Sequence, residues 1–224
     1  MISMLIAVPL DDRDYEKKLT LCKQKGADIV ELRVDLFENK DPDFVLECVK
    51  KAQSIGLKTI LTVRSEKEGG KYVANRLEIF QKASPHSDYT DIELSSQELL
   101  SKVRDIVVSA GKKLIISYHN FELTPANYIL KEVFREARRW GAHIVKISVK
   151  ANSYEDTARL LCLGKEEEGQ KVLIAMGEYG KLSRIGGFVF GSVISYAFLD
   201  EAVAPGQFAL EKLVELRRLL FEDG

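Results

Sequence analysis

Short apolar segments alternate with longer amphipathic segments along the chain, and this alternation restricts the fold more than any other sequence feature. Continuous apolar segments of four to eight residues are typical of strands covered on both faces, as in a parallel sheet. The sequence predicts eight such strands: Met4–Leu10, Ile29–Val34, Lys58–Val63, Tyr89–Leu94, Lys113–Tyr118, His143–Ser148, Val172–Met176 and Val193–Phe198.

A helix-like segment follows each predicted strand, and most of these segments end at a glycine or before a proline. Thr124 and Pro125 are expected to cap and begin the fifth helix. The expected helices are Tyr15–Lys25, Asp43–Ile55, Tyr72–Ala83, Gln97–Ala110, Ala126–Trp140, Tyr154–Glu168, a short one within Leu182–Ser192, and Ala209–Phe221.

Eight strand–helix units within 224 residues favour a closed (β/α)8 TIM barrel of the α/β class over an open doubly wound sheet. No linker, low-complexity stretch or block of charge divides the chain. We therefore expect one domain that spans residues 1–224.

Charge, cysteine content and missing motifs exclude several functions. The 33 basic and 34 acidic residues give a net charge of −1, which leaves no basic surface for nucleic acid. Cys22, Cys48 and Cys162 form no C-x-x-C pair, which argues against a disulfide framework and a zinc site. The sequence has no P-loop, no dinucleotide-binding glycine motif after the first strand and no H-E-x-x-H.

The N-terminal segment lacks the basic region of a secretory signal. No apolar stretch approaches the roughly 20 residues that span a bilayer. We expect a cytoplasmic protein without a membrane partner.

A lysine lies inside the sixth apolar segment. Lys146 alternates with Val145 and Ile147, so its side chain faces the barrel interior if those two face the helices. Burial lowers the pKa of an amine, and part of it is then a neutral nucleophile at pH 7. The plainer interpretation is a strand-end lysine that reaches water or pairs with a carboxylate such as Glu93, and the rarity of buried lysine favours it.

His119 ends the preceding strand, so we expect it beside Lys146 at the barrel mouth, where active sites of such barrels lie. Histidine can take and return a proton within one cycle, although it could equally satisfy a buried carbonyl. The segment Glu68–Gly70 is interpreted either as a turn or as a loop that brings Glu68 to His119. The turn is the simpler interpretation.

Three arginines, Arg33, Arg64 and Arg184, are expected to converge on the same mouth. The forked donors of arginine suit the carboxylate and hydroxyls of a substrate. The alternative is a buried ion network with three carboxylates of neighbouring strands: Glu31, Asp91 and Glu93.

Several short motifs follow one another along nearly the whole chain. They are ELRVD at 31–35, TVRS at 62–65, EGG at 68–70, DIELS at 91–95, SYHNFELTP at 117–125, GAHIVKISV at 141–149, AMGEYGKLSR at 175–184, FGSVISYA at 190–197 and APGQ at 204–207. In this order and spacing they resemble the type I 3-dehydroquinate dehydratases.

The resemblance implies a reaction. Members of that family dehydrate 3-dehydroquinate to 3-dehydroshikimate by syn elimination through a lysine Schiff base, the third step of the shikimate pathway to chorismate and aromatic amino acids. The resemblance implies that Lys146 forms the Schiff base, that His119 is the general acid and base, and that Glu68 orients His119.

The resemblance also implies how substrate is held. Arg184 would pair with the substrate carboxylate, assisted by Gln207, and Asp91 would belong to a buried polar network. Other residues would bind the ring hydroxyls or form the walls around the ring: Glu31, Arg33, Arg64, Met176 and Tyr196. It further implies a homodimer with a small-molecule substrate, no metal and no organic cofactor.

Two positions depart from the family pattern. Val203 stands just before APGQ, where many members carry Ser or Thr, and Pro9 stands where some have a serine that reaches substrate. Because the three catalytic positions are in place, these departures concern affinity more than reaction type.

Two other functions are weighed against this one. A Schiff-base aldolase or transaldolase shares the barrel and a lysine on the sixth strand, but Arg184 and APGQ suit a carboxylate better than a phosphate. A catalytically silent binding barrel is the second, and the presence of both Lys146 and His119 argues against it.

Overall fold

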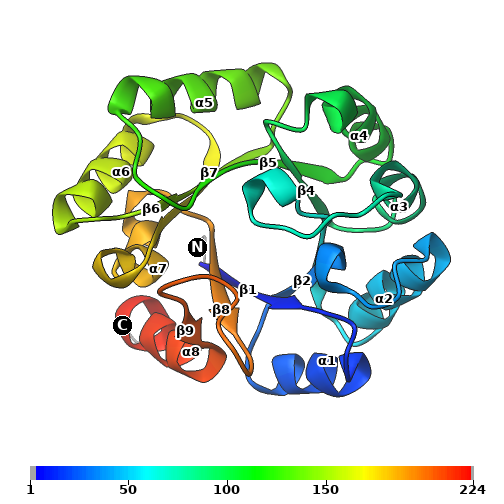
Figure 1. Cartoon of the computed structure of the whole chain (residues 1–224). Helices are drawn as coiled ribbons and strands as arrows, with labels where there is room; N and C mark the ends of the chain where they lie inside the picture. Colours follow the sequence, from blue (N-terminus) through cyan, green and yellow to red (C-terminus); the bar gives the residue numbers. More distant parts are fainter. Residues whose placement is uncertain (1–3, 223–224) are drawn as a thin grey trace.

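Eight parallel strands lie at the centre of the molecule and are surrounded by helices in the computed structural model, which describes residues 4–222 (Figure 1). Neighbouring strands along the chain are hydrogen-bonded to each other from β1 to β7, and β1 also pairs with β8. The strands are β1 (Leu5–Leu10), β2 (Ile29–Arg33), β3 (Lys58–Thr62), β4 (Tyr89–Glu93), β5 (Lys113–Asn120), β6 (Ile144–Lys150), β7 (Gln170–Met176) and β8 (Ile194–Phe198).

The ring of strands closes between β7 and the residues that lead into β8. Lys171 and Ser192 form a parallel bridge, and the backbone N–H of Val193 donates to the carbonyl of Lys171 at 2.9 Å. The (β/α)8 barrel predicted from the alternation is thereby confirmed, with every expected strand at its place in the order. A two-residue strand, β9 (Phe208–Ala209), pairs with β8 and was not predicted.

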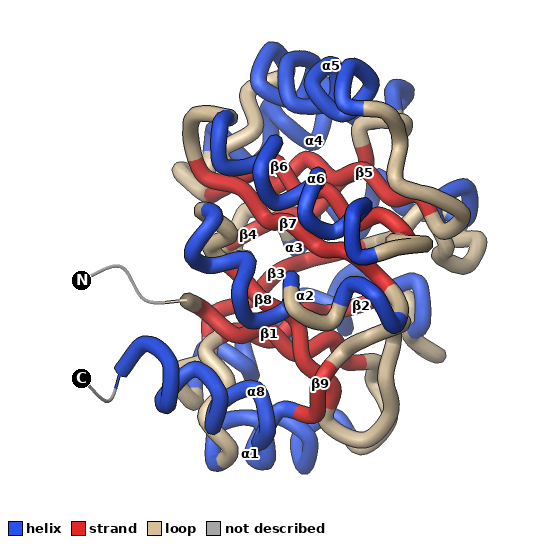
Figure 2. The backbone as a smooth tube through the Cα atoms, turned by 90° about the vertical axis from the view of Figure 1, so that its left-hand side faces the viewer, coloured by secondary structure: helices blue, strands red, loops and turns tan. Residues whose placement is uncertain are grey.

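The helices form the outer layer (Figure 2). They are α1 (Tyr15–Gln24), α2 (Pro42–Ser54), α3 (Arg76–Ala83), α4 (Gln97–Ser109), α5 (Asn127–Arg139), α6 (Tyr154–Glu166), α7 (Ser183–Gly186) and α8 (Leu210–Arg217). The expectation of only a short seventh helix is confirmed. Short 3₁₀ turns η1 (Val34–Leu36), η2 (Glu66–Glu68), η3 (Glu178–Gly180) and η4 (Gly187–Phe190) and a π-helical turn η5 (Arg218–Glu222) complete the described elements.

The predicted start of the third helix at Tyr72 is wrong, because α3 begins at Arg76. The preceding residues form a loop across the barrel mouth, where Gly70 lies against the backbone of Arg64. The guanidinium of Arg76 donates to the carbonyl of Val63 at 2.8 Å and so ties the first turn of the helix to the end of β3. The chain therefore passes along the edge of the cavity at Glu68 and Gly69 before it begins the helix.

The predicted cap of the fifth helix is also wrong. The hydroxyl of Thr124 donates to the carbonyl of Lys150 at 2.8 Å, so it links the loop before α5 to the last residue of β6 instead of accepting from the helix. The helix begins at Asn127, and its N-cap residue Ala126 makes no side-chain cap.

Alternate residues of each strand face two different cores. In β6, Val145, Ile147 and Val149 pack outward against the helices. The inward residues of the barrel include an apolar layer on the N-terminal side, formed by Ala7, Ile29, Ile60, Ile115, Ile144, Val172 and Ile194. Toward the C-terminal ends, the inward positions from β2 to β6 carry polar residues, whereas β7 contributes Ile174 and Met176, so the mouth is mostly polar and the floor is apolar.

Candidate active site

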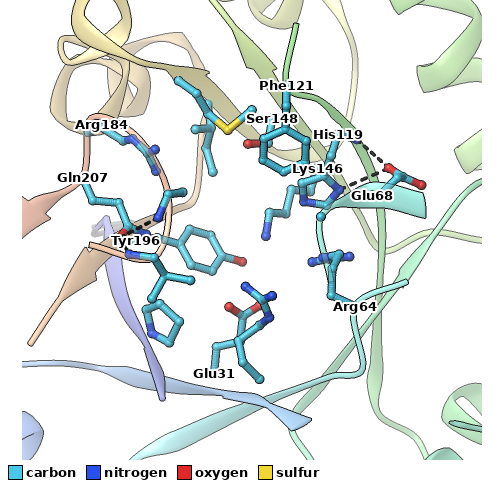
Figure 3. Close-up of a pocket in the computed structure, with 17 residues that line it drawn as sticks. Glu31, Arg64, Glu68, His119, Phe121, Lys146, Ser148, Arg184, Tyr196 and Gln207 are labelled. Carbon is cyan, nitrogen blue, oxygen red and sulfur yellow. Dashed lines mark hydrogen bonds and ion pairs between the residues drawn. The ribbon is translucent and has the colours of Figure 1, made fainter. Parts of the chain in front are cut away.

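Strand β6 places Lys146 inside the barrel, where its side chain is 5% exposed. Its Nζ lies 3.5 Å from Oδ2 of Asp91 and 4.1 Å from the centroid of the Tyr196 ring (Figure 3). Burial lowers the pKa of Lys146, although the charge of Asp91 opposes the shift. A buried amine whose pKa is lowered is neutral more often near pH 7 and can then attack a carbonyl carbon.

Strand β5 brings His119 to the mouth, one inward position beyond Ser117, which is in register with Lys146. Burial lowers the pKa of His119 well below its ordinary value, and the positive charges of Arg64 and Lys146 act in the same direction. The ring is therefore neutral near pH 7 and one of its nitrogens can accept a proton.

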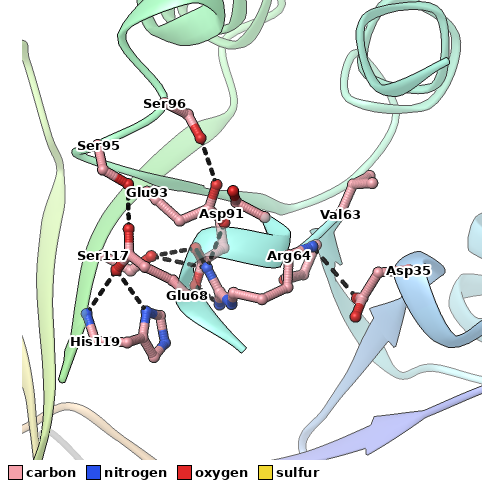
Figure 4. Close-up of polar contacts among 12 residues, drawn as sticks. Asp35, Val63, Arg64, Glu68, Asp91, Glu93, Ser95, Ser96, Ser117 and His119 are labelled. Atoms are coloured by element: carbon pink, nitrogen blue, oxygen red, sulfur yellow. Dashed lines mark hydrogen bonds and ion pairs between the residues drawn. The ribbon is translucent and has the colours of Figure 1, made fainter. Parts of the chain in front are cut away.

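Glu68 lies beside His119. Its Oε1 accepts a hydrogen bond from the backbone N–H of His119 at 2.7 Å and is 3.2 Å from Nδ1 of the ring (Figure 4). Its Oε2 accepts a hydrogen bond from the Ser95 hydroxyl. When the ring proton is on Nδ1, facing Glu68, Nε2 is the nitrogen left to accept another. The segment 68–70 thus brings a buried carboxylate to the histidine, so the second interpretation is the correct one and the preferred interpretation as a turn alone is wrong.

Arg64 is the centre of a buried ion network. It donates to Asp91 at 2.9 and 3.0 Å, to Glu93 at 2.7 Å and to the Ser117 hydroxyl at 2.9 Å (Figure 4). Although burial alone would raise it, the pKa of Asp91 is lowered by Arg64 and then by Lys146. Arg64 also lines the cavity described below, so it belongs both to this network and to the cavity wall.

Arg33 and Glu31, from β2, line the opposite part of the mouth but do not pair with each other. Arg33 donates to both carboxylate oxygens of Asp35 at 2.9 Å, and Glu31 accepts from the Thr62 hydroxyl at 2.8 Å. Glu31 and Arg33 therefore both line the cavity, and each is held there by a buried partner of its own.

Arg184, in α7, is 2% exposed and donates through one terminal nitrogen to the carbonyl of Pro205 at 2.9 Å. Its Nε is buried without a hydrogen-bond partner among the described residues. Burial lowers its pKa to about 10. No carboxylate of the described residues neutralises Arg184, so its positive charge is available to an anionic ligand.

Gln207 holds the loop after β8 at the mouth. Its Oε1 accepts from the backbone N–H groups of Val203, at 2.9 Å, and Ala204, at 3.4 Å. The amide nitrogen of Gln207 makes no such bond to that loop, which leaves a donor for a ligand beside Arg184.

Every predicted site residue except Asp91 lines one cavity at the mouth of the barrel. The wall includes each residue expected to be catalytic or to bind substrate, together with Pro9 and Val203. Asp91 lies beneath the wall, against Lys146 and Arg64.

Sequence reasoning missed several residues of this site. Ser95 and Ser117 bind Glu68 and Asp91; both lie in the motifs DIELS and SYHNFELTP, but no role was assigned to either. Phe121 stacks on the His119 ring with centroids 6.2 Å apart and an interplanar angle of 11°. Its place in the SYHNFELTP motif, two residues after His119, was the available signal. The other unpredicted wall residues are Gly69, Ser148, Ile174 and Ala204.

No group of three His, Cys, Asp or Glu residues suited to a metal is found within residues 4–222. The same part of the chain contains no helix long and apolar enough to cross a membrane. Cys22, Cys48 and Cys162 lie on outer helices, as expected.

The model of the type I 3-dehydroquinase family matches residues 6–223. The chain belongs to this family. The resemblance seen in the motifs is thereby confirmed, and with it the hydro-lyase class of enzyme.

The 3-dehydroquinate dehydratase of Aquifex aeolicus is 60% identical to this chain, over 97% of this chain and 99% of its own length. That of Hydrogenobaculum is 53% identical over the same shares. The crystal structure of the Aquifex aeolicus enzyme superposes with a TM-score of 0.94 over 97% of this chain and 99% of that one. A deoxyribose phosphate aldolase from Aeropyrum pernix, at 16% identity and a TM-score of 0.61 over 95% of this chain and 88% of that one, shares the fold alone.

Proposed function

We propose that this chain dehydrates 3-dehydroquinate to 3-dehydroshikimate through a Schiff base on Lys146, as the third step of the shikimate pathway to chorismate and the aromatic amino acids. The observation that carries the proposal is the buried amine of Lys146 in one cavity with the His119–Glu68 pair. Membership of the type I 3-dehydroquinase family supports the substrate.

The first stage joins substrate to enzyme. The neutral Nζ of Lys146 adds to the C3 carbonyl carbon, and the carbonyl oxygen takes up a proton to give a carbinolamine. His119 relays protons so that this oxygen leaves as water and a protonated imine forms. Low proton affinity in the buried His119 and Lys146 favours both the free amine and the free base at the start.

The second stage eliminates water from the ring. Nε2 of His119 removes a proton from C2, and the electron pair of that C–H bond moves into the imine to give an enamine. The enamine returns the pair, the C1–oxygen bond breaks, and His119 gives its proton to the departing hydroxyl, which leaves as water. A further water then hydrolyses the conjugated imine, which releases 3-dehydroshikimate and free Lys146. Glu68 orients His119 throughout.

Binding groups surround these reacting atoms. Arg184, whose buried Nε has no partner within residues 4–222, would hold the substrate carboxylate, and Gln207 would assist through its amide nitrogen. The ring hydroxyls would meet Glu31, Arg33 and Arg64, and the ring would pack between Met176 and Tyr196.

A sugar-phosphate aldolase reaction is the second candidate, because it also begins with a lysine imine. Arg184, which no carboxylate within residues 4–222 neutralises, lies next to Gln207 and favours a carboxylate over a phosphate. Cleavage of a sugar phosphate, with no dehydration of 3-dehydroquinate, would favour the aldolase.

We further propose a cytoplasmic homodimer that uses no metal or organic cofactor, in keeping with the family resemblance. Sedimentation that returns the mass of one chain would contradict the dimer, and loss of activity after chelation would contradict the metal-free reaction.

Borohydride trapping tests the Schiff base directly, because it reduces an imine to a stable secondary amine. With 3-dehydroquinate present, we expect a single adduct whose mass maps to Lys146. Lys146→Ala should lose both the adduct and turnover. Lys113→Ala, which removes an exposed lysine of β5, is the matched control and should keep both. Turnover or trapping by Lys146→Ala would overturn the assignment.

A further inference from the structure

The hydroxyl of Tyr196 is buried in the cavity wall without a hydrogen-bond partner among the described residues. Tyr196 is an inward residue of β8 and is 3% exposed. Burial, with Glu31 and Asp91 nearby, raises its pKa well above the ordinary value, so the phenol keeps its proton and is a donor. A buried hydroxyl donor is normally paired, because leaving it unpaired costs free energy.

The position of this hydroxyl distinguishes it from other unpaired buried groups. Figure 3 shows it directed into the middle of the cavity, between Lys146 and Glu31. Within residues 4–222, five buried side-chain polar atoms lack a partner, and Tyr196 Oη and Arg184 Nε are the two whose residues line this cavity. Both are donors, as expected where a ligand supplies the acceptors.

The part of the cavity wall formed by β1, β8 and Val203 carries no hydroxyl group other than that of Tyr196. β1 lies next to β8, with Ala7 in register with Tyr196, and Pro9 is the next inward residue of β1. Val203 follows β8 and lines the same cavity. Neither Pro9 nor Val203 has a side-chain donor, so the phenol is the hydroxyl that this wall presents to a ligand.

The ring of Tyr196 also fixes which part of a ligand the hydroxyl can reach. The Lys146 Nζ lies 4.1 Å from the ring centroid, so a carbon joined to that nitrogen lies over or beside the same ring. Arg184, which faces the carboxylate in the proposed function, is a separate donor with its own acceptor.

We propose that the Tyr196 hydroxyl donates a hydrogen bond to an oxygen of the substrate's carbocycle, near the carbon that Lys146 attacks, in place of the hydroxyls absent at Pro9 and Val203. This role rests on the proposed function and adds a polar contact to the ring packing of Tyr196. It makes Tyr196 a residue that selects ligands carrying an oxygen at that point of the ring.

Tyr196→Phe tests the hydroxyl alone, since the ring and its contact with Lys146 are retained. We expect the KM for 3-dehydroquinate and the Kd of 3-dehydroshikimate, measured by calorimetry, to rise about tenfold, the worth of one hydrogen bond. The Tm without ligand should be equal or higher, because the variant removes an unpaired buried group. Tyr89→Phe is the control, because Tyr89 packs on the same inner core but does not line the cavity, and its constants should stay within twofold.

Constants within twofold of wild type in Tyr196→Phe would overturn the proposal, as would a lower Tm with an unchanged Kd, which identifies a structural hydroxyl. Borohydride trapping at saturating 3-dehydroquinate separates this failure from failure of the proposed function. An adduct on Lys146 in both proteins, with unchanged binding, rejects only the role of Tyr196. Absence of the adduct in wild type rejects the Schiff-base reaction itself.

Discussion

The amine of Lys146 and the imidazole of His119 share one buried environment, which lowers the pKa of both groups. Burial lowers both pKa values, and Arg64 adds a positive charge near each. Asp91 opposes the shift at both residues and keeps the buried positive charges balanced. The lowered pKa values increase the unprotonated fraction of both the nucleophile and the base, and the unprotonated forms are the ones that imine formation and proton removal require.

Removal of the imidazole should separate these two events. His119→Ala should lower kcat by roughly 10²–10⁴-fold, the usual worth of general acid–base catalysis, while Lys146 still forms some borohydride-trapped adduct. His86→Ala, which removes an exposed imidazole before β4, should match wild type in both assays. Turnover of His119→Ala within threefold of wild type would contradict the assigned role.

At the scale of elements, the loop that joins β3 to α3 carries the carboxylate that faces His119. This loop fits closely against the strand it follows, because a Cβ at Gly70 would lie 2.0 Å from the carbonyl oxygen of Arg64. That contact is with backbone, so a side chain at Gly70 must move the loop. Glu68 lies two residues earlier and must move with it.

Gly70→Ala should therefore lower kcat by about 10²-fold, the effect of misplacing a catalytic group by about 1 Å, while trapping at Lys146 persists. The control is Gly111→Ala, where no atom lies within 4 Å and the positive φ of 70° costs stability without reaching the site. Kinetics alongside thermal unfolding distinguish the two variants. A wild-type kcat in Gly70→Ala would show that the loop tolerates the shift.

The elements that the sequence predicted well are those with a repeated pattern. The alternation of Val145, Lys146 and Ile147 predicted which way the lysine points, because strand periodicity is local. The start of α3 and the cap of α5 could not be predicted, since Arg76 and Thr124 bind carbonyls at the ends of β3 and β6, which only the folded barrel brings near. Ser95 was missed for the same reason, because its partner Glu68 is 27 residues away.

At the scale of the whole molecule, the network of Asp91, Arg64 and Lys146 joins strands β3, β4 and β6 across the barrel interior. The folded-state pKa of Asp91 lies below its ordinary value of 3.8. The ionised carboxylate therefore stabilises the fold fully above about pH 4, and this contribution is lost as pH falls toward the folded-state pKa.

Asp91→Asn should lower the free energy of unfolding at pH 7 by about 3–5 kcal/mol, because it leaves two buried cations with less compensation. Urea unfolding at pH 7 and at pH 3 measures both parts of the effect, and the difference between variant and wild type should shrink at pH 3. Asp105→Asn removes an exposed carboxylate paired with Arg104 and should cost less than about 1 kcal/mol. Equal losses in the two variants would contradict a stabilising role for the network.

The apolar floor of the barrel determines on which side water and product can leave the cavity. Ile29, Ile115 and Ile144 fill the interior below the reactive amine and close the cavity on that side, so a ring bound at Lys146 would lie between this floor and the mouth. We expect the water lost from the ring to be released on the closed side of the cavity, beside the imine on Lys146 whose hydrolysis frees the product. The closed floor would thus keep a water molecule near the imine for the final hydrolysis while the bound ring still separates the site from bulk solvent.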